Sequence, residues 1–269
     1  MLPIIDHRPV TEIKLPESKR RISIKPYKTS QEKIILQSIA DETDRKDWFL
    51  NMKQIIADNV NEEIDFNEMS MIDFVYICMK LRTISKGQTI DYGFECDGEI
   101  IDDEGQHLKC GFQFKESDSI DDLIIIKNSE VTKKMVDVNK NLSIELTVPK
   151  LKYMEFLCDL NRNDVQMIDA QSADVSIFKY NIDLFSNLLA HSVTKVIVKD
   201  KDGKTKTYTE FTAEEMKENV ILNLTVDELE KLFEAKSDMI AIVLKVTKQC
   251  KKCGKVFEKE DPNFFAFIA

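Results

Sequence analysis

Two cysteines in the segment QCKKCGK, Cys250 and Cys253, have the spacing of a metal-binding turn and are followed directly by Gly254. A polar turn of this kind lets both sulfurs face one ion, and the neighbouring lysines favour the thiolate form of cysteine. A structural zinc site takes four ligands in a tetrahedral arrangement. The segment therefore predicts one half of a zinc site and leaves the other half to be found.

The second half is predicted at Cys96 and Cys110. Apolar residues alternate in QTIDYGFEC and in HLKCGFQF, which is typical of strands, and the turn-rich DGEIIDDEGQ lies between them. The two cysteines end one strand and begin the other, so a hairpin with a long tip would bring them together. His107 is a substitute ligand. Zinc here would join the middle of the chain to its C-terminal part, and structural zinc contributes on the order of 10 kcal/mol to folding.

Two alternatives to zinc stay open for these four cysteines. They can be buried reduced thiols of a vestigial metal-binding turn, or two independent thiol pairs. A redox role is disfavoured, because a redox C-x-x-C is expected at a strand-to-helix turn with an aromatic or proline neighbour. The lysine-rich segment QCKKCGK does not have those neighbours.

Other chemistry has little support in the sequence. The chain has no phosphate-binding loop, no dinucleotide glycine fingerprint, no GxSxG and no HExxH. His107 and His191 lie in different parts of the chain with no nucleophile motif beside either. Cys78 and Cys158 belong to apolar helical stripes, which predicts that both are buried in the core. We therefore expect a protein that is not an enzyme.

The composition indicates a globular protein with protein partners. Against 38 lysines and arginines stand 48 acidic residues, for a formal charge of −10, which disfavours general binding to nucleic acid. The first residues lack a signal-peptide pattern, and no apolar run has the length of a membrane helix. A cytosolic protein without membrane partners is expected, and in that compartment paired cysteines indicate metal rather than disulfides.

The elements that position the cysteines predict an α+β fold in three parts. Residues 1–88 are expected to form a helical unit with a β entry, in which short strands flank PESKR and three helices follow. The third of these, SMIDFVYICMKLRTIS, is predicted to begin at Ser70, with Asp73 in the capping position three residues on, and to end at Gly87.

Residues 89–150 are predicted to be a region of antiparallel β hairpins, with further strands at DLIIIKN and LSIELTVP. Residues 151–269 are predicted to be a mixed α+β region that ends in the C-x-x-C turn and an aromatic segment. Here helices in KLKYMEFLCDL and SIFKYNIDLFSNLLAHS precede a hairpin that turns at Asp-Gly. Two short helices with capping boxes at Thr212 and Thr225 follow, then a buried strand in DMIAIVLKV.

The C-terminal segment NFFAFIA carries three phenylalanines, Phe264, Phe265 and Phe267. Such a segment is costly in water unless its rings are covered. It is expected either to pack on its own domain or to insert into a partner.

Several segments together resemble a known family, and their order and spacing carry the resemblance. They are Leu2-Pro3-Ile4, Leu15-Pro16-Glu17-Ser18, Lys25-Pro26-Tyr27, Glu32-Lys33, Met52-Lys53-Gln54-Ile55-Ile56, Ile72-Asp73-Phe74-Val75-Tyr76, Leu81-Arg82, Gly87, and the closing Cys250, Cys253, Gly254, Phe264 and Phe265. In this combination the chain is similar to the baseplate hub subunit family of T-even-like bacteriophages. The resemblance is good over about the first 90 residues, thin over the middle and partial at the end.

The resemblance implies a late, non-enzymatic protein of bacteriophage tail assembly. It would be a subunit of the baseplate hub or an assembly chaperone, binding other hub proteins or the tape-measure protein in the host cytoplasm or in the virion tail. The candidate contact residues are Tyr27, Trp48, Phe264, Phe265 and Phe267, since aromatic residues are enriched at binding hot spots. The alternative is a zinc-ribbon-like module that contacts nucleic acid or a host protein through the lysines of residues 245–255.

Overall fold

A computed structural model describes residues 7–40, 45–101, 105–153, 182–200 and 202–261 of the chain. The fold is α+β, as the sequence predicts, with small antiparallel sheets and short helices. The elements in the first part of the chain are β1 (Thr11–Lys14), β2 (Arg21–Ile24), α1 (Thr29–Ala40), α2 (Arg45–Asn59), α3 (Met71–Lys86), β3 (Thr89–Glu95), β4 (Glu99–Ile101), β5 (His107–Lys109), β6 (Gln113–Ser119), α4 (Ile120–Leu123) and β7 (Ile124–Lys127).

The elements of the remaining part are β8 (Lys133–Asn139), β9 (Leu142–Thr147), the 3-10 turn η1 (Leu151–Tyr153), α8 (Ile182–Ala190), β10 (Val193–Lys199), β11 (Thr205–Tyr208), α9 (Ala213–Asn219), the 3-10 turn η2 (Ile221–Asn223), α10 (Val226–Ser237), β12 (Ala241–Gln249) and β13 (Val256–Asp261). None of the helices in the described part of the chain is long and apolar enough to cross a membrane.

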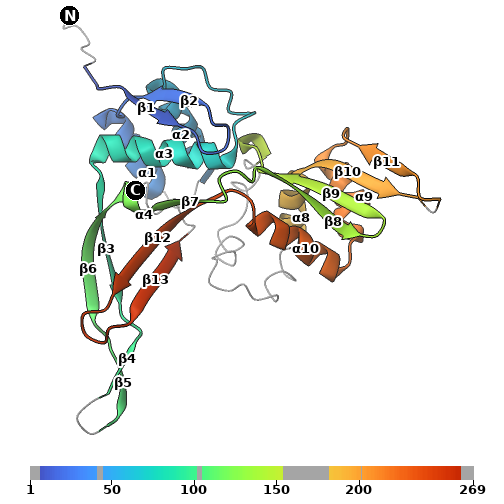
Figure 1. Cartoon of the computed structure of the whole chain (residues 1–269). Coiled ribbons are helices and arrows are strands. Elements are labelled where there is room, and N and C mark those ends of the chain that lie inside the picture. The colour runs from blue at the N-terminus through green and yellow to red at the C-terminus, as the bar shows by residue number, and fades with distance from the viewer. Residues whose placement is uncertain (1–6, 41–44, 102–104, 154–181, 201, 262–269) are drawn as a thin grey trace, which may run out of the picture.

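The elements form two lobes and a long arm (Figure 1). One lobe contains α1, α2 and α3 with the β1–β2 hairpin. The other contains the four-stranded sheet β11-β10-β9-β8 with α8, α9 and α10. The arm consists of the β3–β6 hairpin beside β12 and β13, and the small β4–β5 hairpin projects from its far end.

The first lobe forms as the amphipathic patterns predict. The PESKR segment turns between β1 and β2, which pair in antiparallel register. The side chain of Ser70 accepts a hydrogen bond from the backbone N–H of Asp73 and so caps α3, and the helix ends at Gly87 with a φ of 103°. The apolar faces of the three helices and both strands share one core, in which Trp48 and Phe74 are buried.

The second lobe has its own core between its sheet and its helices. Both predicted capping boxes are present: Thr212 exchanges hydrogen bonds with Glu215 at the start of α9, and Thr225 does so with Glu228 at the start of α10. The predicted hairpin of β10 and β11 also forms, with Gly203 at a φ of 78° in its turn.

Strand β12 links the first lobe to the arm. Its first half pairs with β7 and places Ile242 and Leu244 in the first core, whereas its second half pairs with β13 and continues to Cys250. The two large cores therefore do not follow the boundaries expected at residues 88 and 150. The first core combines residues from both ends of the chain, because β12 returns to it.

The central hairpin differs from the prediction in one respect. Strand β3 pairs with β6 from Thr89↔Ser119 to Glu95↔Gln113, so the segment HLKCGFQF is not one strand. It is divided between β5 and β6, and the expected loop between the two cysteines forms the separate β4–β5 hairpin. Strands β8 and β13 were not among the predicted elements.

Candidate metal centre

Two β hairpins place the four cysteines at the end of the arm. The β3–β6 ladder ends at the pair Glu95↔Gln113, directly before Cys96, and the β12–β13 ladder ends at Gln249↔Val256, directly before Cys250. The two hairpins are held side by side by their aromatic rings: Phe94, Phe114 and Phe257 form a stack with ring centroids 4.4 and 4.8 Å apart.

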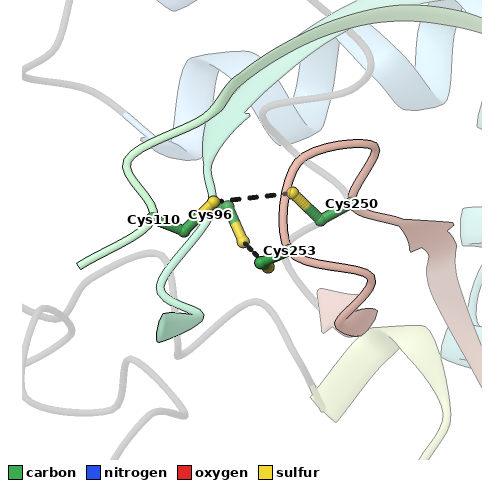
Figure 2. A group of neighbouring side chains, drawn as sticks. All are labelled: Cys96, Cys110, Cys250 and Cys253. Carbon is green, nitrogen blue, oxygen red and sulfur yellow. Dashed lines mark hydrogen bonds between the residues drawn. The ribbon is translucent and has the colours of Figure 1, made fainter. Parts of the chain in front are cut away.

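The structure brings Cys96, Cys110, Cys250 and Cys253 together (Figure 2). All four Sγ atoms lie within 4.8 Å of one another. The distance between Sγ atoms is 3.6 Å for Cys96 and Cys253 and 3.7 Å for Cys110 and Cys250. Three of the side chains are buried, with exposed fractions of 0% for Cys96, 3% for Cys110 and 2% for Cys250, and that of Cys253 is half-buried.

These distances suit a tetrahedral ion bound by thiolates. With metal–sulfur bonds of about 2.3 Å, the edge of a regular tetrahedron of sulfurs is about 3.8 Å. Both short Sγ distances lie close to that value, and both join one turn to the other rather than the two cysteines of one turn. Among the described residues, these four cysteines are the group of side chains placed closely enough to hold a metal ion.

A glycine leaves room for the sulfurs. A Cβ atom added to Gly98 would lie 2.7 Å from the Sγ of Cys253 and 3.3 Å from that of Cys96. The backbone of Gly98 does not have a positive φ, so an alanine would force the neighbouring sulfurs to shift without straining the backbone conformation. The cluster therefore includes a fifth position whose residue type matters.

The pKa values of three of the thiols are shifted, and not all in the same direction. Burial raises the pKa of Cys96 to about 12 and also raises the pKa of Cys110. Burial acts in the same direction on Cys250, but hydrogen bonds from the backbone N–H groups of Cys253 and Lys252 and from the thiols of Cys253 and Cys96 together lower the pKa of Cys250 to about 6. Of these three cysteines, Cys250 is the one that most readily becomes a thiolate, the form that binds metals.

Lysines of the second turn connect the two turns. The ammonium of Lys252 donates to the backbone carbonyl of Cys110 at 2.9 Å, and that of Lys255 pairs with Asp97 at 2.8 Å. Lysines of the same region on β12 are also paired, Lys245 with Glu258 and Lys248 with Asp118. The basic cluster that suggested nucleic-acid binding is therefore engaged largely with the protein's own carboxylates.

The other predicted ligand and core cysteines have distinct positions. His107 lies on β5 with its Nδ1 3.2 Å from the carboxylate of Glu99, and it is not part of the sulfur cluster. Cys78 is buried in the first core, as predicted, and burial raises the pKa of its thiol. Cys158 lies outside the described residues.

Of the five residues predicted to contact a partner, Tyr27 and Trp48 belong to the described residues. Tyr27 is half-buried against the first core, and burial raises the pKa of its hydroxyl to about 12. Trp48 is 8% exposed within that core, so its position does not suit a direct partner contact, because its ring packs inside the lobe. The three phenylalanines, Phe264, Phe265 and Phe267, lie outside the described residues.

Sequence reasoning missed Gly98 and the two lysines that connect the turns. Gly98 had a detectable signal, since a glycine two residues after Cys96 suits a tight turn beside a ligand. The roles of Lys252 and Lys255 had none, because their partners lie 142 and 158 residues away in the chain.

The fold and the cluster together define an α+β protein with a four-cysteine site in its arm. A family model described as T4 bacteriophage base plate protein matches residues 8–266, so the chain belongs to this family. No curated protein matched the chain, and neither did any solved structure. Membership confirms the resemblance to baseplate proteins of T4-like phages, and it implies a structural role in the phage tail among other tail proteins.

Proposed function

We propose that this chain is a non-enzymatic component of the baseplate hub, as a subunit or as an assembly chaperone. It binds other hub proteins or the tape-measure protein and thereby brings tail components together. The observation that carries this proposal is the family match over residues 8–266, which spans both lobes and the arm. The acidic charge of −10 keeps the free protein soluble before assembly.

The absence of an enzymatic role is part of the same proposal. In the described part of the chain, the groups that most often act in catalysis are engaged in structural contacts. The cysteines of the arm face one another, His107 contacts Glu99, and the ring of His191 stacks on Tyr153 with centroids 4.4 Å apart.

The helical lobe offers a surface for a protein partner. Its helices α1 and α2 expose three large apolar side chains, with exposed fractions of 40% for Ile34, 45% for Leu36 and 48% for Leu50. Apolar side chains at this exposure contribute to association when a partner covers them. The second lobe contains a matched control on α10, where Val226 is 67% exposed.

The role in assembly is tested with a nonsense mutation in the gene, in a phage whose genome encodes this chain. We expect infected cells to accumulate incomplete baseplates, seen by electron microscopy and by a slower sedimentation of tail material. Mass spectrometry of purified virions then separates the two forms of the proposal, since a subunit is retained and a chaperone is not. Normal numbers of complete tails in the mutant would contradict the proposal.

The surface is tested by co-purification with the hub and tape-measure proteins of the same phage. In a double variant with Leu36→Glu and Leu50→Glu, the amount of co-purified partner should fall at least tenfold. In Val226→Glu it should stay unchanged. Equal retention by both variants would show that the contact lies elsewhere.

A further inference from the structure

The two cysteine turns have the same backbone hydrogen bonds, although their sequences differ in length. In the first turn, the N–H of Cys96 donates to the carbonyl of Phe112 at 2.8 Å. In the second, the N–H of Cys250 donates to the carbonyl of Lys255, also at 2.8 Å. Each acceptor lies two residues beyond the second cysteine of its turn.

The equivalence extends to the glycines that follow the second cysteines. Gly111 donates to the carbonyl of Cys96 at 3.1 Å, and Gly254 donates to the carbonyl of Cys250 at 2.9 Å. Both glycines have a positive φ, 60° for Gly111 and 75° for Gly254. This conformation favours glycine and lets the chain reverse directly after a ligand.

The sulfurs themselves receive equivalent hydrogen bonds. The backbone N–H of Gly98 donates to the Sγ of Cys96 at 3.4 Å, and that of Lys252 donates to the Sγ of Cys250 at 3.4 Å. Such bonds stabilise a thiolate more than a thiol, because they place a partial positive charge against the sulfur. Each turn thus directs one backbone N–H at the sulfur of its first cysteine, in the same geometry.

These correspondences align residues 96–98 and 110–112 with residues 250–255. The apparent C-x13-C spacing is therefore a C-x2-C-G turn with residues 99–109 inserted between its third and fourth positions. The insertion is the β4–β5 hairpin, and the N–H of Cys110 donates to the carbonyl of Gly98 at 2.7 Å where the insertion leaves and rejoins the turn.

We propose that these two equivalent turns bind one structural zinc ion through the thiolates of Cys96, Cys110, Cys250 and Cys253. Paired turns that present two sulfurs each are what tetrahedral coordination by four thiolates requires, and the Sγ distances of 3.6 and 3.7 Å between the turns agree with it. Four protein ligands leave no position for water or substrate, so the ion has no catalytic role. On binding, Zn²⁺ displaces the remaining thiol protons to solvent.

The zinc ion would fix the base of the β4–β5 hairpin to the β12–β13 hairpin. The site lies where both ladders end, so without metal the two turns are joined by weaker contacts, among them the aromatic stack, the lysine contacts and the contacts between the thiols. This proposal does not depend on the function proposed above, since it concerns the chain alone.

The first test is metal analysis of the untagged full-length protein, purified under reducing conditions. We expect one zinc per chain and, after exchange with Co²⁺, the visible absorption bands of tetrahedral cobalt bound to thiolates. Changing any one of the four cysteines to serine should lower zinc content by at least tenfold, whereas Cys78→Ala and His107→Ala should retain it. Iron in place of zinc, absence of metal, or full zinc retention in any of the four serine variants would overturn the proposal.

A second variant keeps the test decisive if the serine variants do not fold. Deleting residues 99–109 joins Gly98 to Cys110 and converts the first turn into C-x2-C-G. The deletion variant should bind one Co²⁺ with the same spectrum as the full chain. A loss of cobalt binding in a variant whose Trp48 fluorescence remains native would overturn the equivalence of the two turns.

Discussion

Replacing Asp73 with alanine tests how the first lobe is held together. Its carboxylate is 2% exposed and accepts hydrogen bonds from the backbone N–H groups of Glu17, at 2.8 Å, and Ser18, at 3.1 Å. It therefore ties the turn of the β1–β2 hairpin to the first turn of α3. A carboxylate at this position also interacts favourably with the N-terminal end of the helix dipole.

The magnitude follows from these contacts. A hydrogen bond to a charged group contributes about 1.5–3 kcal/mol to stability. Water can replace the bond to Ser18, which is exposed, but not readily that to Glu17, which is half-buried. We therefore expect Asp73→Ala to lower the free energy of unfolding of this lobe by about 2–4 kcal/mol, and Asp73→Asn by about half as much because an amide oxygen still accepts.

The assay is urea denaturation followed by the fluorescence of Trp48, the one tryptophan of the chain, which is buried in the same core. The matched control is Asp121→Ala, because Asp121 forms an exposed ion pair with Lys80 and its loss should cost less than about 1 kcal/mol. If Asp73→Ala and the control shift the transition equally, the carboxylate does not hold the hairpin on the helix and our reasoning is refuted.

Three further substitutions test the arm and the second lobe. Gly98→Ala should weaken metal binding and speed thiol labelling, because its Cβ would lie 2.7 Å from the sulfur of Cys253; His107→Ala, in the adjoining hairpin and outside the sulfur cluster, should do neither. Thr225→Ala removes a capping box and should lower the free energy of unfolding of the second lobe by about 1 kcal/mol, measured by circular dichroism in urea; no change would show that the cap is dispensable. Burial lowers the pKa of Lys236 from 10.5 to about 8, so the unfolded chain holds this proton more tightly than the folded one. The resulting penalty is fully present below pH 8 and disappears above pH 10.5, so Lys236→Met should stabilise the protein by about 1–3 kcal/mol at pH 7 and by little at pH 10.5; a pH-independent gain would contradict this cause.

Local signals in the sequence were sufficient for the helices and tight turns. Helix α3 begins after Ser70 and ends before Gly87, and α9 and α10 begin at capping boxes. These ends could be predicted because each signal acts over three or four residues. Strands with charged residues were harder to predict. The segments KKMVDVN and VFEKED of β8 and β13 resemble solvated loops, and they become strands because a neighbouring strand supplies their hydrogen bonds.

The cysteine site also combines a turn that local sequence predicts with one that depends on contacts distant in the chain. The spacing of Cys250 and Cys253 predicted one turn, since all its determinants lie in six consecutive residues. The insertion of residues 99–109 hides the matching turn, whose hydrogen bonds appear only when the β3–β6 ladder brings Cys96 and Cys110 back together.

By itself, the sequence determined the α+β class, both ends of α3, the starts of α9 and α10, and the four cysteines as one candidate site. Tertiary structure decided which hairpins meet, that β12 returns to the first core, and that Trp48 is buried rather than presented to a partner. The physical reason is range. Caps and turns depend on atoms a few residues apart, whereas the two Sγ pairs join residues separated by 140 and 157 positions, and only packing of the whole arm specifies those distances.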